Sequence, residues 1–241
     1  MIKKICLLIT LFICLTGCIN YDVGIDFPQA NQGHFTQKIS LSEQLSNVSE
    51  KEGHQWLKNI EKKASQLHGK TKYLSADEIL VDIPFYNGQD LVEKFNQFFL
   101  TSLDNDRFDD EDISILDVSA NLSLDQNNVF VIERKKLDLV ADLTSLGVSS
   151  EEGEIIFSSG DLINLQVNLN LPLGATIATN EFAQWEKQEN GIYNIQLQAG
   201  KVNEISATFW VPNYVGLGSI AILLFISLGY FAKYRKLPLV N

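Results

Sequence analysis

An uncharged apolar stretch near the C-terminus, residues 211–232, places the strongest constraint on how this chain can fold. At about 1.5 Å per residue, a helix of this length is about 33 Å long, which is enough to cross the hydrocarbon core of a bilayer. Pro212 suits the first turn of such a helix, where backbone N–H groups have no partners. We therefore expect one transmembrane helix at residues 211–232 and a short cytoplasmic tail at residues 233–241.

The residues that flank this stretch indicate its orientation. Aromatic residues at both ends match the aromatic belts found at membrane interfaces, and basic residues follow the stretch directly. Under the positive-inside rule these basic residues hold the C-terminus in the cytoplasm, so the rest of the chain lies outside it. The predicted interface residues are Trp210, Tyr214, Tyr230, Lys233, Arg235 and Lys236.

The N-terminus has the pattern of a lipoprotein signal peptide. Lys3 and Lys4 precede an apolar run, which ends in Leu15-Thr16-Gly17-Cys18. Small residues before a cysteine are typical of a lipobox, in which the thiol receives a diacylglycerol and the preceding peptide is removed. We predict a signal peptide at residues 1–17 and lipidation, with acyl chains such as palmitate, at Cys18. The alternative is an accidental cysteine in a cleaved signal or in an uncleaved signal anchor.

The segment between the two anchors, residues 18–210, is long enough for one large domain with its own core. It holds all 30 acidic residues but only 14 of the 19 basic residues, so its net charge is −16. Such a surface repels phosphate backbones, so we expect no nucleic-acid partner. The chain has three cysteines and none follows Cys18, which excludes disulfides within the domain.

Hydrophobic periodicity predicts an α+β domain. Tyr21–Phe27 and His34–Leu41 alternate as a hairpin, and residues 118–124, 165–171 and 195–199 alternate in the same way. Residues 129–143 form either a strand pair or one long strand, and residues 203–210 lead into the membrane span. A capping box at Ser49 starts one amphipathic helix, which Gly69 ends, and a second helix follows Asn87-Gly88. We expect the two helices to cover one mostly antiparallel sheet of about seven or eight strands.

The second helix supplies the candidate ligand-binding surface. Its apolar residues recur on one face, with three phenylalanines among them. That face either lines a lipid-binding cleft or packs in the core, and core packing is the default interpretation. The residues are Leu91, Phe95, Phe98 and Phe99.

Catalytic and metal-binding patterns are weak. The acidic cluster Asp104–Asp112 has oxygen ligands at alternating positions, but it lacks the glycine of an EF-hand loop and Phe108 interrupts it, which favours a solvated loop over a Ca²⁺ site. The three histidines are far apart in the sequence. No nucleophile elbow, P-loop or HExxH motif is present. We therefore predict no metal site, no cofactor and no enzymatic activity.

Four features together resemble an uncharacterised family of cyanobacterial lipoproteins with an LppM-like domain. They are the lipobox Leu15–Cys18, the strand Asp22–Phe27, the motif Leu171-Pro172-Leu173-Gly174-Ala175, and Phe209-Trp210-Val211-Pro212 before the C-terminal span. The resemblance implies a plasma or thylakoid membrane location. It also implies a lipid-binding ectodomain, although no motif carries a ligand residue over to this chain.

The sequence therefore favours a non-enzymatic lipoprotein, anchored at both ends in one membrane, whose extracytoplasmic domain binds a lipid or amphiphile. Its expected partners are membrane lipids. The alternative is an interaction or assembly module, whose acidic domain docks a basic membrane-protein partner. Association of that kind is sensitive to salt, because exposed charges are screened over about 8–10 Å. The sequence does not fix the oligomeric state.

Overall fold

The computed structural model describes residues 19–28, 31–41, 50–100, 118–149, 155–158, 163–172 and 174–234. The predicted signal peptide, Cys18, the acidic cluster Asp104–Asp112, Arg235 and Lys236 lie outside these residues.

The larger sheet has seven strands in the order β11-β12-β9-β1-β2-β4-β3. They are β1 (Ile19–Asp26), β2 (Gly33–Leu41), β3 (Lys70–Ser75), β4 (Glu78–Phe85), β9 (Ile163–Asn170), β11 (Ala183–Lys187) and β12 (Tyr193–Leu197). The predicted hairpin of β1 and β2 is confirmed, with Ile19 opposite Leu41 and Asp26 opposite His34. However, β1 also pairs with β9 in parallel, so this sheet is mixed rather than antiparallel throughout.

A second sheet packs against the first, which corrects the expectation of a single sheet. It has the order β10-β13-β6-β5 and is antiparallel at every pairing. Its strands are β5 (Ser119–Val129), β6 (Ile132–Asp142), β10 (Thr176–Thr179) and β13 (Val202–Pro212). A short 3₁₀ turn, η1 (Thr144–Leu146), leads to a separate hairpin of β7 (Gly147–Ser149) and β8 (Ile155–Ser158).

Three helices accompany the sheets in the described part of the chain, and they do not form the expected two-helix cover. The predicted helices are α3 (Glu50–Gln66), which packs on β3 and β4, and α4 (Gly88–Leu100), which lies between β4 and β5. The Asn96 amide ties α4 to the edge of the second sheet, because its Nδ2 donates to Leu122 O at 2.9 Å and its Oδ1 accepts from Leu122 N at 2.7 Å. One helix thus closes the sheet edge in place of a further strand.

The core lies between the two sheets and under α3 and α4. Alternate residues of each inner strand point into it, as in β1, where Ile19, Tyr21, Val23 and Ile25 are buried while the residues between them are exposed or half-buried. Phenylalanine rings from distant segments meet there. The ring of Phe27 lies 5.1 Å from the rings of both Phe85 and Phe209, a distance typical of favourable aromatic pairs.

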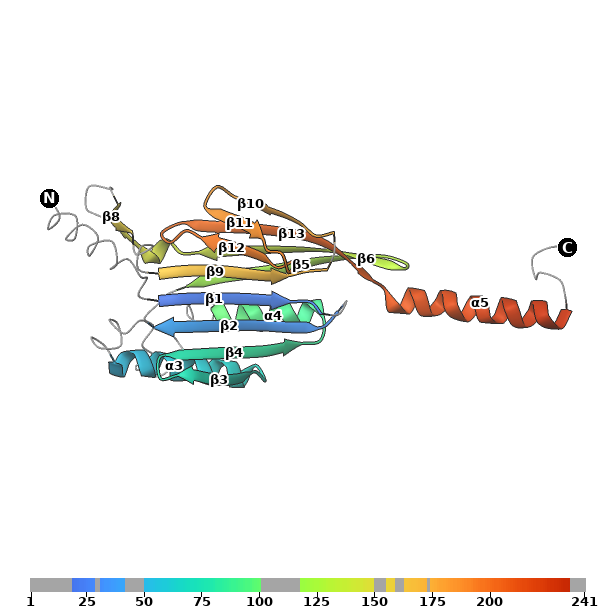
Figure 1. Cartoon of the computed structure of the whole chain (residues 1–241), viewed down its shortest axis with the longest axis horizontal. Coiled ribbons are helices and arrows are strands. Elements are labelled where there is room, and N and C mark those ends of the chain that lie inside the picture. Colours follow the sequence, from blue (N-terminus) through green and yellow to red (C-terminus); the bar gives the residue numbers. More distant parts are fainter. Residues whose placement is uncertain are drawn as a thin grey trace, which may run out of the picture.

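The third helix, α5 (Tyr214–Tyr234), projects from one end of the domain (Figure 1). It starts later than the sequence pattern suggested, because Val211 and Pro212 still pair with β6 as the last residues of β13. Asn213 caps the helix, since its Oδ1 accepts from Val215 N at 3.0 Å. Among the described residues, α5 is the one helix long and apolar enough to cross a membrane, and it is exposed along nearly all of its length.

Candidate functional site

The phenylalanine face of α4 is buried in the core of the domain. Its four candidate residues, Leu91, Phe95, Phe98 and Phe99, are all at most 5% exposed. The Phe35 ring of β2 packs among three of them, with ring centroids 5.1 to 5.8 Å apart. The default interpretation of this stripe, core packing, is therefore the one that the structure supports.

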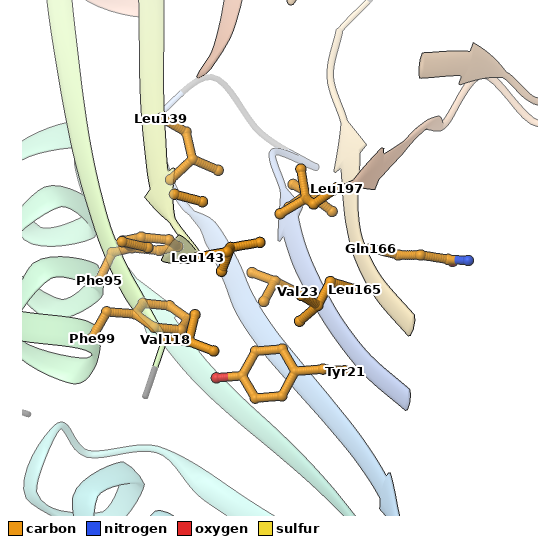
Figure 2. Close-up of a pocket in the computed structure, with 13 residues that line it drawn as sticks. Tyr21, Val23, Phe95, Phe99, Val118, Leu139, Leu143, Leu165, Gln166 and Leu197 are labelled. Atoms are coloured by element: carbon orange, nitrogen blue, oxygen red, sulfur yellow. The ribbon is translucent and has the colours of Figure 1, made fainter. Parts of the chain in front are cut away.

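Phe95 and Phe99 also line a narrow crevice between the sheets. Figure 2 shows Tyr21 and Val23 of β1 facing Leu139, Leu143 and Val118 across it, while the Gln166 amide points away. The crevice has a volume of about 20 Å³. A water molecule needs about 10–15 Å³ by the same measure, so the crevice holds one small molecule and has no room for an acyl chain.

A polar pair, Tyr21 and Gln37, lies beside this crevice. Burial raises the pKa of the Tyr21 hydroxyl well above its ordinary value, and the neighbouring Gln37 side chain lowers it to a smaller extent. Gln37 is fully buried, and neither its Nε2 nor its Oε1 makes a hydrogen bond of good geometry within the described residues. The two groups are thus close enough to interact electrostatically, but the amide stays unsatisfied.

A larger groove, of about 380 Å³, lies at the end of the domain from which α5 leaves. This volume is within the range of about 300–1,000 Å³ that is usual for ligand sites. Four segment ends form the groove: Phe27 after β1, Asn170–Pro172 at the end of β9, the β11–β12 turn, and Val211–Tyr214 where β13 meets α5. The groove therefore forms where the chain enters the apolar helix.

The groove combines one cation, two amides and several apolar walls. Lys187 is exposed, and its Nζ lies 5.1 Å from the centroid of the Tyr193 ring, within the range of a cation–π contact. The Tyr193 hydroxyl donates to Ala175 O at 2.9 Å, which fixes the ring as a wall. Asn170 and Asn190 add polar atoms at the rim, although the Asn170 amide also donates to Asp26 Oδ1 at 2.7 Å.

Local sequence explains how the β11–β12 turn presents these groups. Gly191 has φ of +86°, a conformation that glycine adopts without strain. Gln188 N donates to Ile192 O, and the Asn190 side chain accepts from Ile192 N, which closes the turn. Sequence reasoning did not assign Lys187 or Tyr193 to a site. The one local signal was the turn pair Asn190-Gly191 beside a lysine.

The predicted interface residues that the structure describes lie at the two ends of α5. Trp210 and Tyr214 are 43% and 63% exposed beside its start. At its other end Tyr230 packs on Tyr234 with ring centroids 4.7 Å apart, and Lys233 Nζ lies 5.1 Å from the Tyr234 ring. The predicted interface residues therefore form two sets, one at each end of the helix.

His34 has a close carboxylate partner that its sequence position did not reveal. His34 Nδ1 lies 2.8 Å from Asp82 Oδ1, across the β2–β4 pairing and 48 residues away in the sequence. Both side chains are close to half exposed on the outer face of the larger sheet. No group of three or more His, Cys, Asp or Glu side chains within the described ranges is arranged to hold a metal ion.

The fold and the groove together define a class of protein: an α+β domain of two packed sheets, joined at its groove end to a single apolar helix. Residues 24–239 match the model of a family described as "Protein of unknown function (DUF3153)", and the chain belongs to that family. No curated protein and no solved structure matches the chain.

Proposed function

We propose that this protein is a membrane-anchored, non-enzymatic lipoprotein that binds the anionic head group of a membrane lipid in the groove beside α5. The observation that carries the proposal is the position of the groove: Tyr214, the first residue of α5, is part of its wall. If α5 spans a bilayer, the groove opens at the level of the lipid head groups. A lipid can then place its head in the groove while its chains stay in the membrane.

The chemistry of the groove suits an anionic head group. Lys187 supplies a positive charge to a phosphate or sulfate, and amide groups such as those of Asn170 and Asn190 donate to head-group oxygens. The apolar walls Leu171, Pro172 and Val211 suit a glycerol backbone and the first methylenes of the chains. The groove thus replaces the α4 face as the amphiphile-binding surface.

Lipidation at Cys18, an extracytoplasmic domain in a plasma or thylakoid membrane and a cytoplasmic C-terminus are part of this proposal. They are supported by the sequence patterns at the two ends of the chain and by the resemblance to LppM-like lipoproteins. In that resemblance the ectodomain is also the lipid-binding part.

Native mass spectrometry of the full chain in nanodiscs or mild detergent tests the proposal, with phosphatidylglycerol and phosphatidylcholine as competing probes. We expect retention of phosphatidylglycerol. Lys187→Glu should weaken it about tenfold or more, because hydrogen bonds to charged groups contribute about 1.5–3 kcal/mol. Lys72→Glu, the same charge change on the exposed edge strand β3, serves as the matched control and should bind as the parent does. Equal retention of both lipids, or equal behaviour of the two variants, would contradict the proposal.

The outer face of the larger sheet favours the second candidate function, a docking module for a basic membrane-protein partner. Amides link β1, β9 and β12 across this face: Asn164 Nδ2 donates to Asn20 Oδ1 at 3.1 Å, and Asn194 Nδ2 donates to Asn168 Oδ1 at 2.9 Å. Acidic groups lie among them, including Asp22, whose partial burial raises its pKa. A partner captured from membranes at low salt and lost at high salt would favour this function over lipid binding.

A further inference from the structure

The turn between β5 and β6 holds four consecutive apolar residues, which we call the hairpin tip (Val129–Ile132), and all of them except the half-buried Val131 are exposed. Val129, Phe130 and Ile132 are 52%, 59% and 42% exposed. Phe130 adopts φ of +52°, a conformation that tight hairpin turns usually assign to Asn or Gly and that is uncommon for a bulky residue. A turn that faced only water would gain nothing from these residues, whereas exposed apolar clusters mark contact surfaces.

Hydrogen bonds hold the hairpin tip against the first turn of α5. Asn213 N donates to Val131 O at 2.8 Å, and Asn213 Nδ2 donates to Asn128 Oδ1 at 2.7 Å. A Cβ atom at Gly216 would overlap the carbonyl oxygen of Phe130, so glycine permits this close approach. The hairpin tip and residues 214–217 therefore lie at the same distance along the axis of α5. Figure 1 shows the β5–β6 end reaching past the larger sheet toward α5.

The length of α5 determines how deep the hairpin tip and the first turn of α5 lie in a membrane. From Val215 to Ala232 the helix has no charged residue, and these 18 residues rise about 27 Å, slightly less than the hydrocarbon core of about 30 Å. A spanning helix therefore cannot leave its first turn in water. Because Phe130 contacts Gly216, the hairpin tip is drawn to the same boundary.

The residues around the hairpin tip suit that boundary. Trp210 is opposite Arg134 in the β13–β6 pairing, two residues behind Ile132, and both side chains are exposed. At about 3.3 Å per residue along a strand, the Trp210 ring and the Arg134 cation lie about 7 Å farther than Ile132 from the hydrocarbon core of the bilayer. This is the depth of the lipid head groups.

We propose that the hairpin tip inserts into the interfacial layer of the bilayer that α5 crosses, so that the domain touches the membrane at two joined points. This inference rests on the spanning role of α5 in the proposed function. It adds a second contact that prevents the domain from swinging about Asn213 and holds the groove at the level of the head groups.

Site-directed fluorescence on the full chain tests the inference. With Cys6, Cys14 and Cys18 replaced by serine, single cysteines at Phe130→Cys, Leu224→Cys and Ser123→Cys carry an environment-sensitive dye. The proteins are reconstituted in vesicles of phosphatidylcholine and phosphatidylglycerol that contain spin-labelled quencher lipids. Leu224 lies within α5 and reports the span, while Ser123 is exposed on the same strand as the hairpin tip, about 23 Å farther from the membrane.

We expect the dye at position 130 to shift to the blue in vesicles and to be quenched by lipids labelled near the head group. The dye at position 224 should be quenched by lipids labelled deep in the chains, and the dye at position 123 by neither. Val129→Cys repeats the measurement at a second tip position in case the Phe130 variant misfolds. Quenching at 224 without quenching at 129 or 130 would overturn the inference and leave the spanning helix intact. Lack of quenching at 224 would overturn the span itself, and this inference with it.

Discussion

Replacing Gln37 with methionine is expected to stabilise the folded protein. The Gln37 side chain is fully buried, and its two polar atoms have no hydrogen-bond partner in the described residues. An unsatisfied buried polar group costs about 1–3 kcal/mol, and methionine fills nearly the same volume without that cost. The lost contact with the Tyr21 hydroxyl offsets part of the gain, by about 0.5–1.5 kcal/mol. The net expectation is an increase of about 1 kcal/mol in the free energy of unfolding.

Thermal unfolding of the full chain in detergent, followed by circular dichroism, measures this change. For a domain of this size about 1 kcal/mol moves Tm by about 2–4 °C, so Gln37→Met should raise Tm by about that amount. Gln184→Met, on an exposed position of β11, is the matched control and should leave Tm unchanged. A loss of more than about 1 kcal/mol in Gln37→Met would refute the reasoning, since it would mean that the amide is satisfied. A double-mutant cycle with Tyr21→Phe would then show whether the tyrosine is the partner.

Two further predictions concern side chains that join elements. Asn96→Ala should lower the free energy of unfolding by about 1–3 kcal/mol in denaturant titrations, because both backbone groups of Leu122 lose their partner, whereas Gln89→Ala on the exposed side of α4 should change it little. The ion pair of Lys38 and Glu78, 2.8 Å apart, lowers the pKa of Glu78 and raises that of Lys38. Its stabilisation is therefore present between these two pKa values and is lost as the pH falls through the folded-state pKa of Glu78 or rises through that of Lys38. Because the pair is partly exposed, the difference in unfolding free energy between the parent and Lys38→Met should be only a few tenths of a kcal/mol at neutral pH and should vanish in acid.

Elements with one buried face could be predicted from the sequence. The 2-residue period of β1, β2 and β9 and the helical period of α3 and α4 each reflect a side that enters the core, so their positions agree with the alternation and capping patterns. The same periods could not show which strands pair. The parallel contact of β1 with β9 joins residues 144 positions apart, such as Asn20 and Asn164, and no local pattern encodes it.

Short edge strands escaped prediction because they lack that period. All but one of the residues of β3 are exposed, and those of β10 and β11 are mostly exposed or half-buried, so no apolar alternation marks them. The groove could not be predicted from the sequence for a related reason. Phe27, Asn170, Lys187 and Val211 come from four separate segments, and only the sheet topology brings their ends together.

The sequence predicts two membrane anchors, and the structure shows how far apart the domain holds the two points at which they would attach. Ile19, the residue after Cys18, begins β1 at the end of the domain opposite α5 (Figure 1). From Ile19 to Asp26 the strand rises about 23 Å, and the neighbouring Phe27 lines the groove beside Tyr214. With α5 upright in a bilayer, a lipid on Cys18 would start at least that far above the membrane surface. Both anchors can enter one membrane only if the domain lies on its side, which the contacts of Asn213 and Gly216 with the hairpin tip oppose.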